Sequence, residues 1–72
     1  MSKVVDARGL SCPQPVILTM GALKDADRGE IVVLVDTDTA RENVSRAASG
    51  KGWAVKRVEP EGTEFRITIG RE

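Results

Sequence analysis

The sequence predicts an α/β fold in which strands and helices follow one another in the order β-α-β-α-β-β. Three features indicate this order: an uninterrupted apolar run at residues 31–35, two stretches with helical apolar spacing, and a strict polar–apolar alternation at residues 64–69. Two helices and four strands pack most simply with both helices on one face of a four-stranded sheet. We therefore expect a two-layer structure.

The first half of the chain is expected to hold a strand, a helix and a second strand. Residues 4–7 form a short apolar strand that closes at Arg8-Gly9. Pro13 suits the first helical position because its φ is already helical, and Gly29 is the expected cap at the end of that helix. The β-branched residues of 30–36 then predict a central strand.

The second half is expected to hold a helix and a hairpin. Thr39 and Glu42 have the spacing of a capping box, which predicts a helix that starts at Thr39 and ends at Gly50 or Gly52. The remaining residues divide into a strand, a tight turn and a strand: 53–59, Pro60-Glu61-Gly62 and 63–70.

Each helix should bury one side only. Val16, Met20 and Leu23 share a helical face, whereas Ile17 and Leu18 fall off it. The second helix has a narrow stripe of small apolar residues: Ala40, Val44, Ala47 and Ala48. Because both helices cover the same face of the sheet, one alternating apolar set of the central strand must lie on the other face. Long neighbouring side chains could cover that set, or a partner or fused domain could dock on it.

Composition limits the classes of protein to which this chain can belong. Its 72 residues suit one small domain, spanning residues 1–72, without the large cleft of a multi-substrate enzyme. Basic and acidic residues number 11 each, and Trp53 and Phe65 are the only aromatic residues, so direct nucleic-acid binding is not expected. No apolar run is long enough for a membrane helix and the first residues are unlike a signal peptide. We expect a cytoplasmic protein that binds no membrane.

The residues available for chemistry are few. The sequence has no histidine and one cysteine, which excludes a Cys/His zinc site, a Ser-His-Asp triad and an internal disulfide within these residues. We expect no metal site and no cofactor. Chemistry is left to carboxylates, to Cys12, or to groups that a partner brings.

Cys12-Pro13-Gln14-Pro15 stands at the expected start of the first helix. Pro13 keeps Cys12 out of the helical conformation, as a helix N-cap requires, and the helix dipole would favour its thiolate. Pro15 removes a further backbone N–H, so this helix start is a poor anion cradle and suits a reactive thiol better. The other interpretation is that Cys12 is a buried apolar residue.

Three residues of the preceding loop are candidates for shaping the site. Asp6 could orient the loop by accepting hydrogen bonds from its backbone N–H groups, or it could be an ordinary polar residue at the end of a strand; Gly9 suits a tight turn. Arg8 could turn its guanidinium toward the Cys12 sulfur, or it could be a solvated arginine.

Residues 6–15, Asp-Ala-Arg-Gly-Leu-Ser-Cys-Pro-Gln-Pro, resemble the signature of the TusA/SirA-like sulfur-carrier family, whose hallmark is a Cys-Pro-x-Pro motif at the start of the first helix. Residues 41–46 are similar to the N-terminal domain of YedF-type proteins, which are associated with selenium metabolism. The resemblance covers essentially the whole chain and implies a two-layer α/β sandwich with a mixed sheet. YedF-type proteins carry a second domain, so the chain is either a stand-alone member or a fragment.

The resemblance also implies a function. Cys12 would accept a sulfane sulfur from a donor such as a cysteine desulfurase, hold it as a persulfide and pass it to an acceptor protein. The residues expected to shape the motif and its loop are Asp6, Arg8, Gly9, Pro13 and Pro15. The protein would be a carrier rather than a stand-alone enzyme. Thiolated tRNA, molybdenum cofactor, sulfur oxidation and selenium delivery could all use such a carrier.

Two other functions compete with this one. Small α/β folds also serve as RNA-binding or regulatory modules, but the zero net charge and scarce aromatic residues argue against that here. An interaction domain with an inert Cys12 fits the composition but leaves the paired prolines unexplained. One set of basic residues is either a solvated face or a contact surface for an acidic partner: Arg41, Arg46, Lys51, Lys56 and Arg57.

Overall fold

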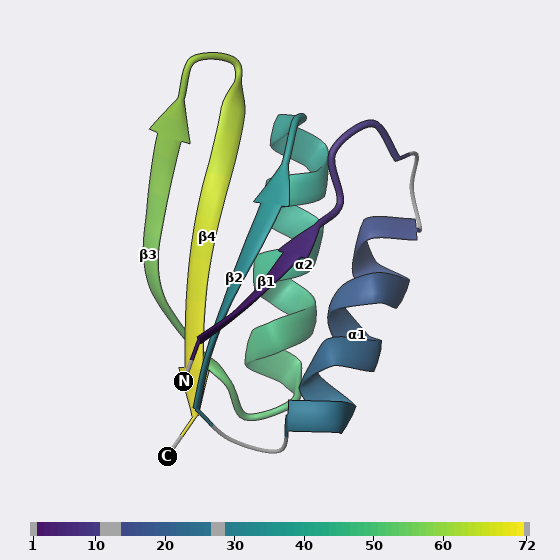
Figure 1. The fold of residues 1–72 in the computed structure, drawn as a ribbon, viewed down its shortest axis with the longest axis vertical. Coiled ribbons are helices and arrows are strands. Elements are labelled where there is room, and N and C mark those ends of the chain that lie inside the picture. Colours follow the sequence, from purple (N-terminus) through teal and green to yellow (C-terminus); the bar gives the residue numbers. More distant parts are fainter. Residues whose placement is uncertain (1, 11–13, 27–28, 72) are drawn as a thin grey trace.

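The computed structural model describes residues 2–10, 14–26 and 29–71, and it has the element order that the sequence predicts. The elements are β1 (Ser2–Asp6), α1 (Gln14–Ala26), β2 (Gly29–Val35), α2 (Asp38–Gly50), β3 (Ala54–Glu61) and β4 (Glu64–Arg71). The strands form one mixed sheet in the order β1-β2-β4-β3, in which β1 is parallel to β2 and the other neighbours are antiparallel. Both helices lie on one face of this sheet (Figure 1), which confirms the predicted α/β class.

The core lies between the sheet and the two helices. The alternating residues of the central strands that face the helices are fully buried: Ile31, Val33 and Val35 of β2, and Ile67 and Ile69 of β4. Leu23 of α1, Val44 of α2 and the Trp53 side chain pack into the same cluster. Burying the apolar face of each element against the others is what holds so small a domain together.

The helix α1 buries the side that its apolar spacing predicts. Leu23 is buried, and Val16 and Met20 pack against the core, whereas Ile17 and Leu18 are 61% and 43% exposed. Thr19 is also buried on this face, and its hydroxyl donates a hydrogen bond to the Pro15 carbonyl oxygen at 2.8 Å. That bond satisfies the one polar side chain that α1 buries.

The predicted start of α2 is wrong by two residues at the cap. Thr37 is the N-cap, with extended backbone angles of φ −135° and ψ 152°. Its side-chain oxygen accepts a hydrogen bond from the backbone N–H of Ala40 at 3.0 Å. Thr39 therefore lies inside the first turn, and the capping box with Glu42 does not form. Both threonines precede the apolar stripe, and only the backbone conformation decides which of them caps the helix.

The predicted turn of the hairpin is also displaced. Pro60 lies within β3 opposite Phe65, and the chain reverses at Gly62 and Thr63. Gly62 has a φ of 63°, a conformation that favours glycine. A proline is tolerated in β3 because this strand is at the edge of the sheet, where half of its backbone N–H groups have no neighbouring strand to bond.

The face of the sheet without helices is partly covered by its own long side chains. Val32 is only 8% exposed there, and Thr68, its partner across the strands, is buried as well. Lys56 reaches over Gly70 on this face and pairs with Glu30 at 3.0 Å between Nζ and Oε2. These contacts favour the interpretation in which neighbouring side chains cover the second apolar set of β2.

Neither helix in the described ranges is long and apolar enough to cross a membrane. Gly29, the expected cap of the first helix, opens β2 with a φ of 107°, and residues 27–28 lie outside the described part of the chain.

Candidate functional site

The candidate site lies at one end of the molecule, where β1 and β2 end and both helices begin (Figure 1). Two parallel strands bring their carboxyl ends to the same edge of a sheet, so the loops that follow them are neighbours. Cys12 and Pro13 lie outside the described residues. The loop before them, residues 7–10, and the helix after them, from Gln14, are described.

Asp6 and Arg8 form a closed turn at the end of β1. Asp6 Oδ1 accepts hydrogen bonds from the backbone N–H of Arg8 at 3.1 Å and from its Nε at 2.8 Å, and Oδ2 accepts from Nη2 at 2.8 Å. Arg8 Nη1 also donates to Glu64 Oε1 of β4 at 3.2 Å. The hydrogen bonds from the Arg8 side chain and backbone lower the pKa of Asp6 to about 2. The hydrogen bonds to Asp6 and Glu64 raise the pKa of Arg8. The guanidinium is thus held between two carboxylates.

Gly9 ties the loop to the end of β2. Its backbone N–H donates to Asp36 Oδ2 at 2.8 Å, and its φ of 77° is one that favours glycine. Ala7, the first residue after β1, donates its backbone N–H to the Leu34 carbonyl oxygen at 2.8 Å. This bond extends the pairing of β1 with β2. The loop that leads to Cys12 is therefore anchored to two strands.

Asp36 is the site residue that the sequence analysis missed. It follows β2 directly, and its carboxylate accepts the hydrogen bond from Gly9 across a separation of 27 residues. A usable signal exists in the sequence, because a carboxylate just after a strand that runs parallel to β1 must lie near the loop after β1.

A hollow of about 290 Å³ lies beside this loop, between the first turns of α1 and α2. Pro15 is buried at its wall, and Leu10 closes the side next to the loop. The residues that line it are Leu10, Pro15, Val16, Thr37, Thr39, Ala40 and Asn43, none of which is charged. Leu10 and Pro15, which line the hollow, flank residues 11–14 in the sequence, and this segment includes Cys12.

The sequence-predicted site residues within the described chain are thus brought to one end of the molecule. Asp6, Arg8 and Gly9 share one hydrogen-bonded loop, and Pro15 lies at the neighbouring helix start. In the ranges that the structure describes, no group of three His, Cys, Asp or Glu side chains could hold a metal ion. The described part of the site therefore consists of an anchored loop next to a hollow without charged side chains.

Comparisons with known proteins agree with one another. The model of the family described as sulfurtransferase TusA matches residues 3–71. A proposed sulfur carrier protein of Methanocaldococcus jannaschii is 38% identical over 68 residues, covering 93% of this chain and 91% of that protein. A proposed sulfur carrier protein of Thermotoga maritima is 32% identical over 71 residues, covering 96% and 90%. The crystal structure of a SirA-like protein from Desulfitobacterium hafniense has a TM-score of 0.85 and 35% identity, covering 97% of this chain and 96% of the other. This chain belongs to the sulfurtransferase TusA family.

Proposed function

We propose that this protein carries sulfane sulfur as a persulfide on Cys12 and relays it between partner proteins. The observation that carries the proposal is the anchored loop that precedes Cys12, held to β2 through Gly9 and Asp36 and to β4 through Arg8 and Glu64. A carrier must present one sulfur to different partners in the same position, and a loop with tertiary anchors suits that task. Membership of the TusA family supports the same function.

The transfer itself needs no group that the sequence lacks. The Cys12 thiolate attacks the outer sulfur of a donor persulfide, a new sulfur–sulfur bond forms on Cys12, and the donor cysteine leaves as a thiolate. In the second half, an acceptor thiolate attacks the outer sulfur held on Cys12, and Cys12 leaves in turn. One sulfur–sulfur bond forms and one breaks at each step, so no external oxidant or reductant is consumed.

The neighbouring residues have positioning roles in this proposal. Asp6 and Gly9 shape the loop through the backbone N–H groups of Arg8 and Gly9. Arg8 is engaged by the carboxylates of Asp6 and Glu64, which favours a structural role over direct stabilisation of the sulfur. Pro13 and Pro15 stiffen the helix start on the other side of Cys12.

The hollow beside the loop would receive the outer sulfur of the persulfide. The outer sulfur is large and polarizable, and the hollow offers it apolar surface from Leu10 and Pro15. The threonine hydroxyls and the Asn43 amide at its far wall could donate weak hydrogen bonds to the sulfur.

An RNA-binding role has less support. In the basic set of the second helix and third strand, four of the five residues are paired with carboxylates: Arg41 with Asp38, Arg46 with Glu42, Lys56 with Glu30, and Arg57 with Glu59. A paired cation contributes less to a phosphate contact because its own carboxylate must first be displaced. The cysteine desulfurase donor, the acceptor protein, a cytoplasmic location and a selenium pathway remain predictions.

The decisive experiment measures the intact mass of the protein after incubation with a cysteine desulfurase and cysteine. We expect the gain of one sulfur atom, lost again on addition of a reductant, because Cys12 is the only cysteine in the sequence. Cys12→Ser is the negative control and should gain nothing. A second arm presents the loaded protein to a downstream acceptor and follows loss of the extra mass. If several persulfide donors leave the wild-type mass unchanged, the carrier function is wrong.

A further inference from the structure

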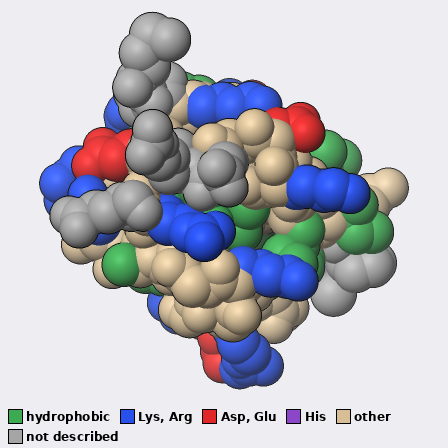
Figure 2. All heavy atoms as spheres, turned by 90° about the horizontal axis from the view of Figure 1, so that it is seen from below, with side chains coloured by type: hydrophobic (Ala, Val, Ile, Leu, Met, Phe, Trp, Pro, Cys, Tyr) green, Lys and Arg blue, Asp and Glu red, His purple; other side chains and the backbone are tan. Residues whose placement is uncertain are grey.

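A second hollow lies at the opposite end of the molecule from the candidate site, where α1 and α2 finish. It measures about 500 Å³, within the range of about 300–1,000 Å³ that is typical of small-molecule sites. The lining residues come from α1, the segment after α2 and the end of β4: Met20, Gly21, Leu23, Lys24, Lys51, Trp53 and Arg71. Viewed from this end, Lys and Arg side chains surround an apolar floor (Figure 2).

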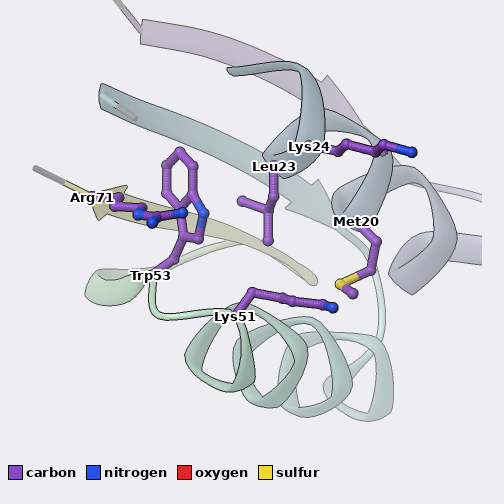
Figure 3. Close-up of a pocket in the computed structure, with 7 residues that line it drawn as sticks. Met20, Leu23, Lys24, Lys51, Trp53 and Arg71 are labelled. Atoms are coloured by element: carbon purple, nitrogen blue, oxygen red, sulfur yellow. The ribbon is translucent and has the colours of Figure 1, made fainter. Parts of the chain in front are cut away.

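The floor and the rim of this hollow differ in character. Leu23 points into the space between Trp53 and Met20, and Lys51 extends toward Met20, while Lys24 reaches outward at the rim (Figure 3). Trp53 is only 3% exposed, so it presents a rigid apolar wall rather than a mobile side chain. Apolar surface beside cationic side chains is a combination that suits an organic anion.

The cations of this hollow differ from most other described cations in that they form no ion pair with a described carboxylate. Arg8, Arg41, Arg46, Lys56, Arg57 and Arg66 each form an ion pair with a carboxylate. Four described cations form no ion pair with a described carboxylate: Lys3, Lys24, Lys51 and Arg71. The last three of these line the hollow. Within the described ranges, three of the four cations that have no carboxylate partner thus line one cavity.

The helix dipoles give a competing explanation for part of this cluster. Lys24 is in the last turn of α1 and Lys51 is the C-cap of α2, where cations stabilise the exposed carbonyl groups. Arg71, however, belongs to β4 and has no helix end of its own. The dipoles also give no reason for a cavity with a tryptophan wall, so a ligand accounts for more of the observations.

We propose that this hollow binds an organic anion whose apolar body rests on the floor that Met20, Leu23 and Trp53 form and whose acid group is attracted by the positive charges of Lys51 and Arg71 at the rim. Lys24 at the rim adds long-range attraction. The hollow is at the end of the fold remote from the loop of Cys12, so the proposal stands or falls independently of sulfur transfer.

The test uses a fluorescent probe and its uncharged analogue. Trp53 is the only tryptophan, and there is no tyrosine, so protein emission reports on this hollow directly. The sulfonate 8-anilinonaphthalene-1-sulfonate should quench Trp53 emission in a saturable way that weakens with added salt. N-phenyl-1-naphthylamine, which has a similar body without the sulfonate, should bind much more weakly. Equal binding of the two probes would contradict the proposal, because the cations would then have no role.

Matched variants locate the binding. Lys51→Gln and Arg71→Gln should each weaken sulfonate binding by about two- to fivefold, and the double variant by about tenfold. Arg46→Gln removes the same charge from an exposed position of α2 outside the hollow and should leave binding unchanged. Near-ultraviolet circular dichroism confirms that each variant is folded.

Three further outcomes would overturn the proposal. The first is binding by Lys51→Gln and Arg71→Gln that equals the wild type, with thermal stability unchanged as well. The second is loss of thermal stability in these variants with unchanged binding, which would assign the cations to the helix dipoles alone. The third is binding of poly-L-glutamate without binding of the sulfonate, which would assign the surface to an acidic protein instead.

Discussion

The two ends of the molecule use charged residues in opposite ways. At the end with the Cys12 loop, Arg8 is held between Asp6 and Glu64, and the carboxylate of Asp36 is hydrogen-bonded to the backbone of Gly9. At the other end, three cations surround an apolar hollow without a carboxylate partner among the described residues. Charges paired with one another shape a loop, whereas cations that have no carboxylate partner in the described ranges can attract an external anion. In one small fold, charged residues thus anchor a loop at one end and surround a hollow at the other.

The sharpest way to separate the two ends is by their effect on sulfur loading. Cys12→Ser should abolish loading completely, whereas Lys51→Gln at the other end should leave both its rate and its extent at the wild-type value. Intact-mass time courses with one desulfurase preparation measure both. A Lys51→Gln variant that loads several times more slowly would show that the two ends are not independent.

The next largest effect is expected at the first turn of α2. Thr37→Ala removes the side-chain oxygen that accepts the Ala40 N–H, and it should lower the free energy of unfolding by about 1 kcal/mol. Thr39→Ala is the matched control, because that side chain caps nothing and should change stability by less than about 0.5 kcal/mol. Urea unfolding of the two variants makes the comparison. A larger loss of stability for Thr39→Ala would mean that Thr39, as the spacing alone predicts, caps the helix instead of Thr37.

A comparable effect of backbone conformation is expected at Gly9. An added Cβ at Gly9 meets no atom within 4 Å, so Gly9→Ala tests only its φ of 77° and should cost about 1 kcal/mol. Gly21→Ala, in the middle of α1, also meets no atom and should raise stability by about 1 kcal/mol. Opposite signs for the same added methyl group, measured by thermal unfolding, are the expected result. Gly9→Ala should also slow sulfur loading, which Gly21→Ala should not.

A smaller effect is expected at Asp36. Asp36→Asn keeps a side-chain oxygen near the Gly9 N–H but removes the charge, so we expect a loss of stability of about 0.5 kcal/mol. The rate of sulfur loading should fall by a larger factor than this stability loss explains, because the loop is held less firmly. Loading that is unaffected, together with lower stability, would assign Asp36 to the fold alone.

The smallest effect is the acid dependence of the loop. The pKa of Asp6 is lowered to about 2, so its ion pair contributes stability at neutral pH, and this contribution is lost as the pH falls from about 4 through about 2. The difference in thermal midpoint between the wild type and Asp6→Asn should therefore shrink over that window. Since both side chains are exposed, the difference is expected to be small even at neutral pH. A difference independent of pH would mean that the side-chain charge of Asp6 is not involved.

Short-range patterns in the sequence predicted most of the fold. Alternation at residues 64–69 predicted β4, and helical spacing correctly separated the buried Leu23 from the exposed Ile17 and Leu18. These predictions succeeded because one buried face requires a fixed period, and the period is visible over a few residues. Where two neighbouring residues could fill the same role, as Thr37 and Thr39 could, the pattern did not distinguish them.

The sequence by itself determined the element order and the apolar faces, and it makes Cys12 the candidate sulfur acceptor because it holds a single cysteine and no histidine. The tertiary structure alone decided the strand order, the pairing of Arg8 with Glu64 56 residues away, and the bond between Gly9 and Asp36. It also decided that cations from three separate parts of the chain line one hollow. The physical reason is distance along the chain: local periodicity is set by neighbouring residues, whereas contacts between remote side chains exist only after the sheet and helices have packed.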